Sequence, residues 1–261
     1  MIRKENKIKV LGYIPARSGS KGVLNKNIKP ISGVPLLEFS VFSAVEAKKE
    51  DLFSEVILST DSDYYLSLVK NYDIEKDYIR PSLIAKDNSA TIDGIKDALY
   101  WLKKFRNISF DAVMTLQPTS PFRTTSHIRK AIELMNNNKK ATSVVSIARL
   151  NHHHPRRIKK MMEGGRLDDF CSDFREIEPS RRQDLEPKAY IRNGAIYLTK
   201  TDSILSKGYI QGPWVIGMEM NEANSVNIDN ELDYLVAQAS IEHHEYKEDL
   251  SFFNKLIQKR N

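Results

Sequence analysis

The sequence predicts an α/β fold with a mainly parallel sheet and helices on both faces. Two observations carry this prediction. Short apolar, β-prone runs alternate with longer runs whose apolar residues have helical spacing, and the alternation continues over residues 8–149. A helix between two strands returns the chain to the same end of the sheet, so successive strands pair in parallel. Sheets of this class bind ligands at the carboxyl ends of their strands.

The predicted elements follow one another with few interruptions. The apolar runs expected to be strands are 8–15, 55–60, 111–117, 141–149, 194–199, 214–220 and 225–229. The expected helices are 35–49, 63–72, 92–105, 126–138 and one that begins near Glu231, capped by Asn230 or Asp229. The alternation stops over residues 150–190, which are rich in Arg, His, Asp and Glu and are expected to form an insertion.

Length and composition limit the kinds of protein that this chain can be. The chain has 261 residues, 41% of them hydrophobic, which is enough for a large domain with its own core. The net charge of +6 is modest and the cations are scattered, which fits an anionic small substrate better than nucleic acid. The single cysteine excludes a disulfide within the chain. No signal peptide and no bilayer-length apolar run is seen, so a cytoplasmic protein without membrane contact is expected.

The stretch IPARSGSKGVLNKN follows the first predicted strand. Its two glycines allow a turn in which several backbone N–H groups point at one anion, and Arg17, Lys21 and Lys26 can neutralise a polyphosphate. It is neither a P-loop nor a dinucleotide fingerprint, because G-x-x-x-x-G-K-[ST] and G-x-G-x-x-G are both missing. An ordinary solvated turn is the alternative, and the three cations favour phosphate binding over it.

Two polar segments follow the second predicted strand. In STDSD, Ser62 or Asp61 is expected to cap the next helix, and a ligand role for Asp61 stays open. The long loop IRPSLIAKDNSATID carries Arg80 before a proline and Thr91 at a helix start. Long loops at the carboxyl end of a strand often bind ligands, so both residues are candidates.

Three later motifs carry further candidates. LQPTSPFRT places Gln117 and Arg123 at the expected ligand edge, although a buried Gln117 can equally satisfy backbone groups. NHHHP is not expected to bind a metal, because consecutive side chains do not converge on one ion; solvated or interface histidines are expected instead. NIDNELD places Asp229 at a predicted strand end, where its carboxylate either holds Mg²⁺ beside phosphates or caps the following helix.

Together, the motifs resemble those of the acylneuraminate cytidylyltransferases, also called CMP-sialic acid synthetases. The matching segments, from about Lys9 to about Gln238, are IPARSGSKGVLNKN, LSTDSD, RPSLIAKDNSAT, LQPTSPFRT, HHP, RRQDL, NGAIY and NIDNELD, in the order of that family. The resemblance implies a Rossmann-like nucleotidyltransferase fold, a homodimer, CTP and Mg²⁺. We therefore expect one catalytic domain at 1–240 with a dimerisation insertion at about 150–192, followed by a peripheral C-terminal helix at 241–261.

The resemblance also assigns roles by position. The residues implied to bind the triphosphate of CTP are Arg17, Lys21, Lys26 and Asn27. The residues implied to hold the cytidine are Arg80 and Thr91. The residues implied to lie near the sugar acid are Gln117 and Tyr197. The insertion residues implied to reach the partner subunit's sugar carboxylate are Arg157 and Arg182. The expected catalytic residues are Arg17, Lys21 and Asp229.

Two departures from the family pattern affect this assignment. The family usually has two metal-binding aspartates, D-I-D, where this chain has Asn227 and Asp229. Asn can bind Mg²⁺ through its carbonyl oxygen but brings no charge, so Asp229 is the expected ligand and the role of Asn227 is open. The segment EPKAYIRNG carries one extra residue, so Arg192 is not expected to superimpose on the family's arginine.

The implied reaction joins CTP to a nonulosonic, sialic-type acid and releases pyrophosphate, by in-line attack of the anomeric hydroxyl on the α-phosphorus. The product would serve surface polysaccharide synthesis. One alternative is a cytidylyltransferase for another keto sugar acid, of the legionaminic or 3-deoxy-manno-octulosonic type. Another is a catalytically impaired nucleotide-binding homologue, which Asn227 favours. A nucleic-acid binder is disfavoured, because the aromatic residues are not interleaved with a basic groove.

Overall fold

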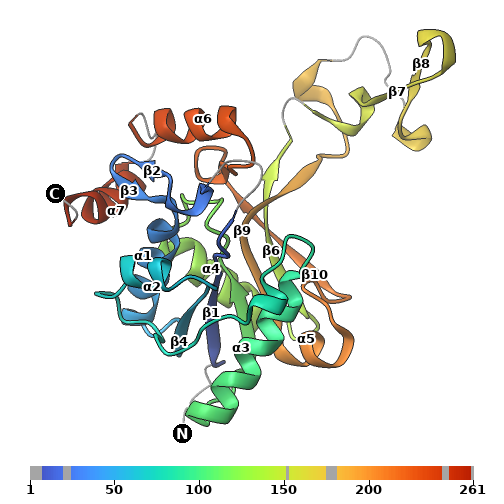
Figure 1. Ribbon diagram of the computed structural model, residues 1–261. Helices are drawn as coiled ribbons and strands as arrows, with labels where there is room; N and C mark the ends of the chain where they lie inside the picture. The colour runs from blue at the N-terminus through green and yellow to red at the C-terminus, as the bar shows by residue number, and fades with distance from the viewer. Residues whose placement is uncertain (1–7, 20–24, 151–152, 175–180, 243–246, 260–261) are drawn as a thin grey trace, which may run out of the picture.

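A computed structural model describes residues 8–19, 25–150, 153–174, 181–242 and 247–259. The strands of its main sheet are β1 (Val10–Pro15), β4 (Glu55–Ser59), β5 (Ala112–Thr115), β6 (Ser143–Arg149), β9 (Tyr190–Lys200) and β10 (Val215–Met220). Within the described residues this six-stranded sheet has the order β10-β6-β9-β5-β1-β4 (Figure 1). Strand β1 is parallel to β4 and β5, β10 is parallel to β6, and β9 is antiparallel to both neighbours. The predicted, mainly parallel α/β sheet is confirmed.

Helices cover both faces of this sheet. The helices packed on one face are α1 (Leu36–Lys49) and α4 (Thr125–Asn137), and those on the other are α3 (Thr91–Arg106) and α5 (Thr201–Lys207). In β1, the side chains of Val10 and Ile14 belong to the hydrophobic core under α1 and α4, whereas those of Leu11 and Tyr13 belong to a second core under α3 and α5. This follows from the period of two along a strand, and it explains why β1 reads as a continuous apolar run.

The C-terminal segment completes a third core and is not peripheral as expected. The segment expected to be peripheral, 241–261, contains α7 (Lys247–Gln258), which follows the helix predicted from Glu231, α6 (Glu231–Glu242). Phe253 of α7 is fully buried, with its ring centroid 6.2 Å from that of Phe39 and 5.5 Å from that of Phe122. Leu256 of α7 is buried as well, whereas Lys255 and Lys259 are exposed, so the buried apolar residues of α7 share a face that packs on α1. The sequence therefore predicted this helix but not its contribution to the core.

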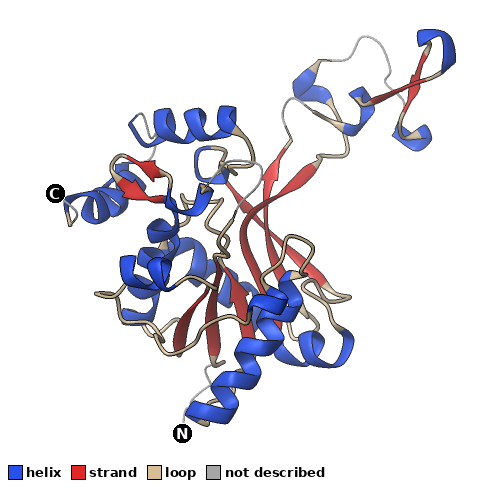
Figure 2. Cartoon of the chain, viewed as in Figure 1, coloured by secondary structure: helices blue, strands red, loops and turns tan. Residues whose placement is uncertain are grey.

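Part of the predicted insertion forms an arm that projects away from the sheet (Figure 2). Its antiparallel hairpin consists of β7 (Lys159–Met161) and β8 (Leu167–Asp169). His154 is buried rather than solvated: its Nδ1 accepts a hydrogen bond from the Arg156 N–H, and its Nε2 lies 2.9 Å from the Pro187 carbonyl oxygen. This histidine therefore joins two segments of the arm.

The last predicted strand, 225–229, does not form among the described residues. A 3₁₀ turn, η7 (Ala223–Ser225), precedes an extended segment. The Ile228 side chain is buried and its N–H donates to the Thr119 carbonyl oxygen at 2.8 Å. The alternation of apolar and polar residues over 225–229 is therefore that of a loop, which is anchored by Ile228 and pairs with no strand among the described residues. None of the helices in the described ranges is long and apolar enough to cross a membrane.

Candidate functional site

The loops that follow β1, β4 and β5 meet at one edge of the sheet, because these parallel strands end there. Backbone hydrogen bonds hold the loops together: the Ala16 N–H donates to the Ser59 carbonyl and the Leu116 N–H to the Tyr13 carbonyl, each at 2.9 Å. Strand β9 runs in the opposite direction, so its first half extends past the end of β5 toward the same edge. This edge is where the sequence places its candidate residues.

The first loop is fastened at two points. The Asp61 carboxylate accepts hydrogen bonds from the Ser18 N–H and the Ser18 hydroxyl, both at 2.7 Å. Asn27 is buried in the 3₁₀ turn η1 (Lys26–Ile28), and its amide donates to the Arg17 carbonyl at 3.0 Å. These contacts fix the backbone that carries Arg17. Lys21 lies outside the described residues.

Asp61 is an anchor for this loop and not a helix cap. Burial opposes ionisation of its carboxyl, but the Ser18 hydrogen bonds, the Asp61 N–H and the charge of Arg80 together outweigh burial and lower the pKa of Asp61. Helix α2 (Asp63–Leu68), shorter than predicted, is capped instead by Ser62, whose Oγ accepts from the Tyr65 N–H at 3.3 Å. Of the two capping residues that the sequence left open, the structure therefore selects Ser62.

Arg17 forms an ion pair that a ligand can replace. Its Nη1 lies 2.5 Å from the Asp87 carboxylate, and the side chains are 31% and 38% exposed. A partly exposed pair of this kind contributes about 1 kcal/mol or less, because water screens both charges. A polyphosphate bound beside the loop would compete for Arg17 at little cost.

Arg80 is buried against helix α3 and is 4% exposed. A Cβ atom at Gly94 would lie 3.1 Å from the Arg80 Cζ, so the missing side chain makes room for the guanidinium. Within the described part of the chain, the Arg80 Nε finds no hydrogen-bond partner. A buried unpaired donor is unfavourable, so an acceptor on a ligand would be stabilised here. Thr91, the first residue of α3, lies nearly one turn before Gly94.

Polar atoms of the site converge on Gly194 of β9. Its φ is +78°, close to the position where the register between β9 and β6 shifts. A Cβ at this position would lie 2.8 Å from Ser120 Oγ, 2.9 Å from Gln117 Oε1 and 3.2 Å from Asn227 Oδ1. Glycine therefore permits both the backbone conformation and the close approach of three polar side chains.

Arg123 is fully buried, so it does not line the ligand edge as predicted. It supports the site from within the core. Its guanidinium donates to the Ala195 carbonyl and to the Ser40 hydroxyl, each at 2.7 Å, and also to the Gln117 carbonyl. Burial lowers the pKa of Arg123 to about 9, so it is charged at neutral pH. The side chain ties helix α1 and strand β9 to the loop of Gln117.

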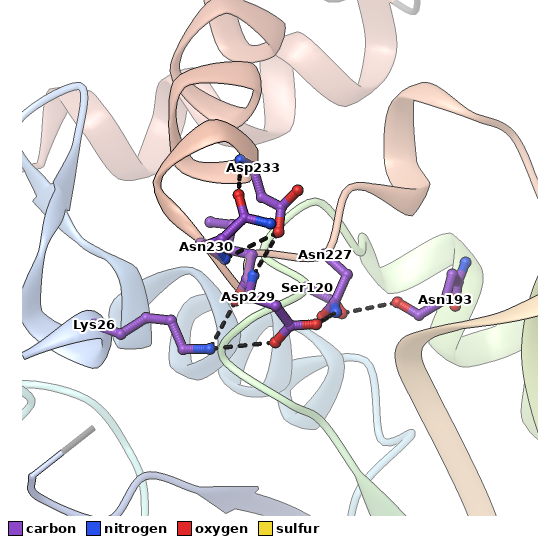
Figure 3. A network of polar contacts seen from close by, with 8 residues as sticks. Lys26, Ser120, Asn193, Asn227, Asp229, Asn230 and Asp233 are labelled. Carbon is purple, nitrogen blue, oxygen red and sulfur yellow. Dashed lines mark hydrogen bonds and ion pairs between the residues drawn. The ribbon is translucent and has the colours of Figure 1, made fainter. Parts of the chain in front are cut away.

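The Asp229 carboxylate is held from two sides (Figure 3). Lys26 Nζ donates to the Ile228 carbonyl at 2.7 Å and lies 3.3 Å from Asp229 Oδ1. The Asn227 amide donates to Asp229 Oδ2 at 2.5 Å. The Asp229 side chain is 67% exposed, so it remains accessible to a ligand.

Helix α6 begins without using the Asp229 side chain. The Asn230 Oδ1 accepts from the Asp233 N–H, and the Asp233 Oδ2 accepts from the Asn230 N–H, both at 3.0 Å (Figure 3). This reciprocal pair caps the helix. Asp229 is thereby left available for the metal role, the alternative to capping that the sequence left open.

The remaining residues of the predicted sugar site lie on β9 and in the insertion. Tyr197 of β9 pairs with Thr115 at the end of β5, and burial raises its pKa. Arg157 lies in the 3₁₀ turn η3 (Pro155–Arg157) of the projecting arm. Arg182 begins the turn η6 (Arg182–Asp184), and its side chain lies outside the described residues. A cavity of about 650 Å³ between α1, α2 and α7 is lined by none of the candidate residues.

A family model matches most of the chain. The model described as cytidylyltransferase matches residues 11–207, which include the loops after β1, β4 and β5 and the arm. The chain belongs to the cytidylyltransferase family.

Two relatives and one solved structure are similar to most of the chain. N-acylneuraminate cytidylyltransferase from Escherichia coli O18:K1:H7 is 30% identical over 97% of this chain, which spans 58% of that relative's length. CMP-N,N'-diacetyllegionaminic acid synthase from Legionella pneumophila is 28% identical over 90% of this chain and 97% of the relative. CMP:2-keto-3-deoxy-manno-octonic acid synthetase, solved in complex with CTP, has a TM-score of 0.62 at 15% identity, covering 90% of this chain and 99% of that one. The last comparison supports the nucleotidyltransferase fold.

Several residues of this candidate site carry no recognisable signal in the sequence. Ser18 and Ser120 hold the two loops, and Gly94 makes room for Arg80. Serines in RSGS and PTSP give no sign of which partner they contact. A glycine inside an otherwise helical run is the one usable signal, because it weakens the helix unless a close neighbour requires it.

Proposed function

We propose that the chain transfers a cytidylyl group from CTP to a nonulosonic, sialic-type acid and releases pyrophosphate. The observation that carries the proposal is the composition of the sheet edge. The cationic first loop, the buried guanidinium of Arg80 and the accessible carboxylate of Asp229 all lie at this edge, in a chain of the cytidylyltransferase family. The related E. coli and L. pneumophila proteins, both named for sugar-acid substrates, support the choice of acceptor.

The first loop would bind the triphosphate. Arg17 and Lys26 supply two cations from its described part, and Lys21 is proposed as a third. Arg80, with its unpaired Nε, is proposed to donate to the cytosine, and Thr91 to lie beside the nucleoside. Positioning and neutralisation of charge are the main requirements of phosphoryl transfer, and these residues supply both.

Mg²⁺ is the proposed cofactor, and the donor set fits it. Mg²⁺ commonly keeps several waters and is held by one or two carboxylates together with substrate phosphates. Asp229 offers one exposed carboxylate beside the proposed phosphate loop, and is proposed as the ligand. Bound there, the ion would neutralise phosphate charge and make a bound water more acidic.

The sugar acid would lie against Gln117 and Tyr197, with the anomeric hydroxyl directed at the α-phosphorus. A bond forms between the anomeric oxygen and this phosphorus while the bond to the β-phosphate oxygen breaks. The hydroxyl proton leaves to solvent, and Arg17 and Lys21 stabilise the departing pyrophosphate. Arg123 would keep the Gln117 loop in place throughout.

A homodimer would complete the sugar site. Arg157 lies on the projecting arm, where large apolar side chains are exposed: Met161 at 76%, Leu167 at 60% and Phe170 at 63%. Apolar surface on an arm fits burial against a second copy. We propose that Arg157 and Arg182 of each arm approach the sugar carboxylate in the partner subunit. A cytoplasmic location is proposed, since the reaction would draw on the cellular supply of CTP.

The acid itself is the testable part of the proposal. The chain would be incubated with CTP, Mg²⁺ and a panel of N-acetylneuraminic, legionaminic and 3-deoxy-manno-octulosonic acids, and the products identified by mass spectrometry. We expect a CMP-sugar from a nonulosonic acid. A product from the legionaminic or the octulosonic acid alone would assign the alternative substrate. CTP binding without any product would favour the impaired homologue, which Asn227 makes a specific alternative.

A further inference from the structure

Asn227 has a defined orientation in the network around Asp229 (Figure 3). Its Oδ1 lies 3.1 Å from Ser120 Oγ, and its Nδ2 lies 2.5 Å from Asp229 Oδ2. The opposite orientation would place an amide oxygen at this short distance from a carboxylate oxygen. Two such oxygens repel each other unless a proton or a cation lies between them. Asn227 therefore acts as a donor to Asp229.

Lys26 occupies the other side of the same carboxylate. Its ammonium group is held by the Ile228 carbonyl at 2.7 Å, so it is fixed 3.3 Å from Asp229 Oδ1 by more than the ion pair. The carboxylate thus has a fixed cation at one oxygen and an amide donor at the other. Among the described residues, no group of three or more His, Cys, Asp or Glu side chains is arranged to hold a metal ion.

From these contacts we infer that Asn227 is a positioning residue and not a metal ligand. We further infer that the chain holds one divalent cation, on Asp229, and only together with the phosphates of the nucleotide. Asp229 alone, neutralised by Lys26, is too weak a site to order the ion, whereas the phosphates add charge and oxygen ligands. This inference rests on the proposed function, because it concerns the metal of that reaction.

The test uses Mn²⁺ as the probe, with the free ion quantified by electron paramagnetic resonance. The proteins are the wild-type chain, Asn227→Asp and the matched control Asn230→Asp. The control adds the same charge three residues later, and its carboxylate can still accept from the Asp233 N–H. Each protein is titrated first alone and then with a CTP analogue whose α–β bridging atom resists cleavage. Thermal melts establish that all three proteins are folded.

Without nucleotide, we expect Asn227→Asp to bind Mn²⁺ at least about tenfold more tightly than the wild type, because a second carboxylate faces the first. Asn230→Asp should behave as the wild type. With the analogue, the wild type should hold one Mn²⁺ and Asn227→Asp two.

Equal nucleotide-free affinities in the wild type and Asn227→Asp would overturn the inference. So would an equal gain in Asn230→Asp, or two ions in the wild type with the analogue. Failure of every protein to bind the analogue would contradict the proposed function, and the nucleotide-free titrations would still decide the role of Asn227.

Discussion

Replacement of Gly194 by alanine separates backbone strain from the contacts that shape the site. Gly33, in a turn between two short strands, has the same φ of +78°, but a Cβ there would meet nothing within 4 Å, whereas at Gly194 it would meet three polar atoms. Both variants should lose about 1–2 kcal/mol of folding stability, because an L-residue is strained at positive φ. For a chain of this size this lowers the melting temperature by about 2–8 °C.

Gly194→Ala should lose more than Gly33→Ala, since its methyl group displaces Ser120 Oγ, which contacts the Asn193 carbonyl at 2.9 Å and Asn227 Oδ1 at 3.1 Å. Weakening one or two such contacts adds about 0.5–3 kcal/mol. The Gln117 side chain is pushed away as well. Loss of one hydrogen bond to the sugar acid would raise its KM about tenfold.

The assay combines thermal melts with pyrophosphate-release kinetics, in which the KM is measured separately for CTP and for the sugar acid. Gly194→Ala should change the KM of the acid more than that of CTP, and Gly33→Ala should change neither. If the two variants had the same melting temperature and the same KM for the acid, Gly194 would be a turn glycine only, and the proposed sugar-acid position would be wrong.

Three further predictions concern the loops and their support. Arg17→Ala should lower turnover at least about a hundredfold, as expected for loss of a preorganised charge donor, and a near-normal rate would refute its phosphate role. Asp61→Asn should weaken the hold on Ser18. Because the folded-state pKa of Asp61 lies below the ordinary 3.8, the stability advantage of the wild type should be full above about pH 4 and fall as the pH is lowered through that pKa, which urea unfolding at several pH values measures. Arg123→Met should destabilise the fold by about 3–5 kcal/mol, since it leaves two carbonyls and a hydroxyl buried without their donor; denaturant unfolding with a shift below about 1 kcal/mol would contradict this.

The sequence predicted the sheet because its strands are apolar on both faces and its helices on one. The prediction from sequence failed where one pattern of apolar and polar residues is compatible with two different structures. Residues 225–229 alternate as a strand does, but the buried Ile228 anchors a loop. The C-terminal helix is expected to be peripheral because charged residues are interspersed with its apolar ones, yet Phe253 reaches the aromatic cluster on α1.

For the site, the sequence indicated which loops matter but not how their side chains are used. Arg17 and Arg123 look alike as cations beside predicted strands. One lies at the surface in an exchangeable ion pair, and the other is buried under three acceptors. Burial depends on contacts from α1 and β9, which are distant in sequence. The orientation of the Asn227 amide likewise depends on Ser120, from a loop more than a hundred residues away.

The central claim is that the chain couples CTP to a sugar acid, and pyrophosphate release tests it most directly. Wild-type chain would be mixed with CTP, Mg²⁺ and N-acetylneuraminic acid or a related nonulosonic acid, and each component omitted in turn. The account predicts release that requires both CTP and one of the acids and that is lost in Arg17→Ala. Release that is independent of any acid, or equal in Arg17→Ala, would contradict it.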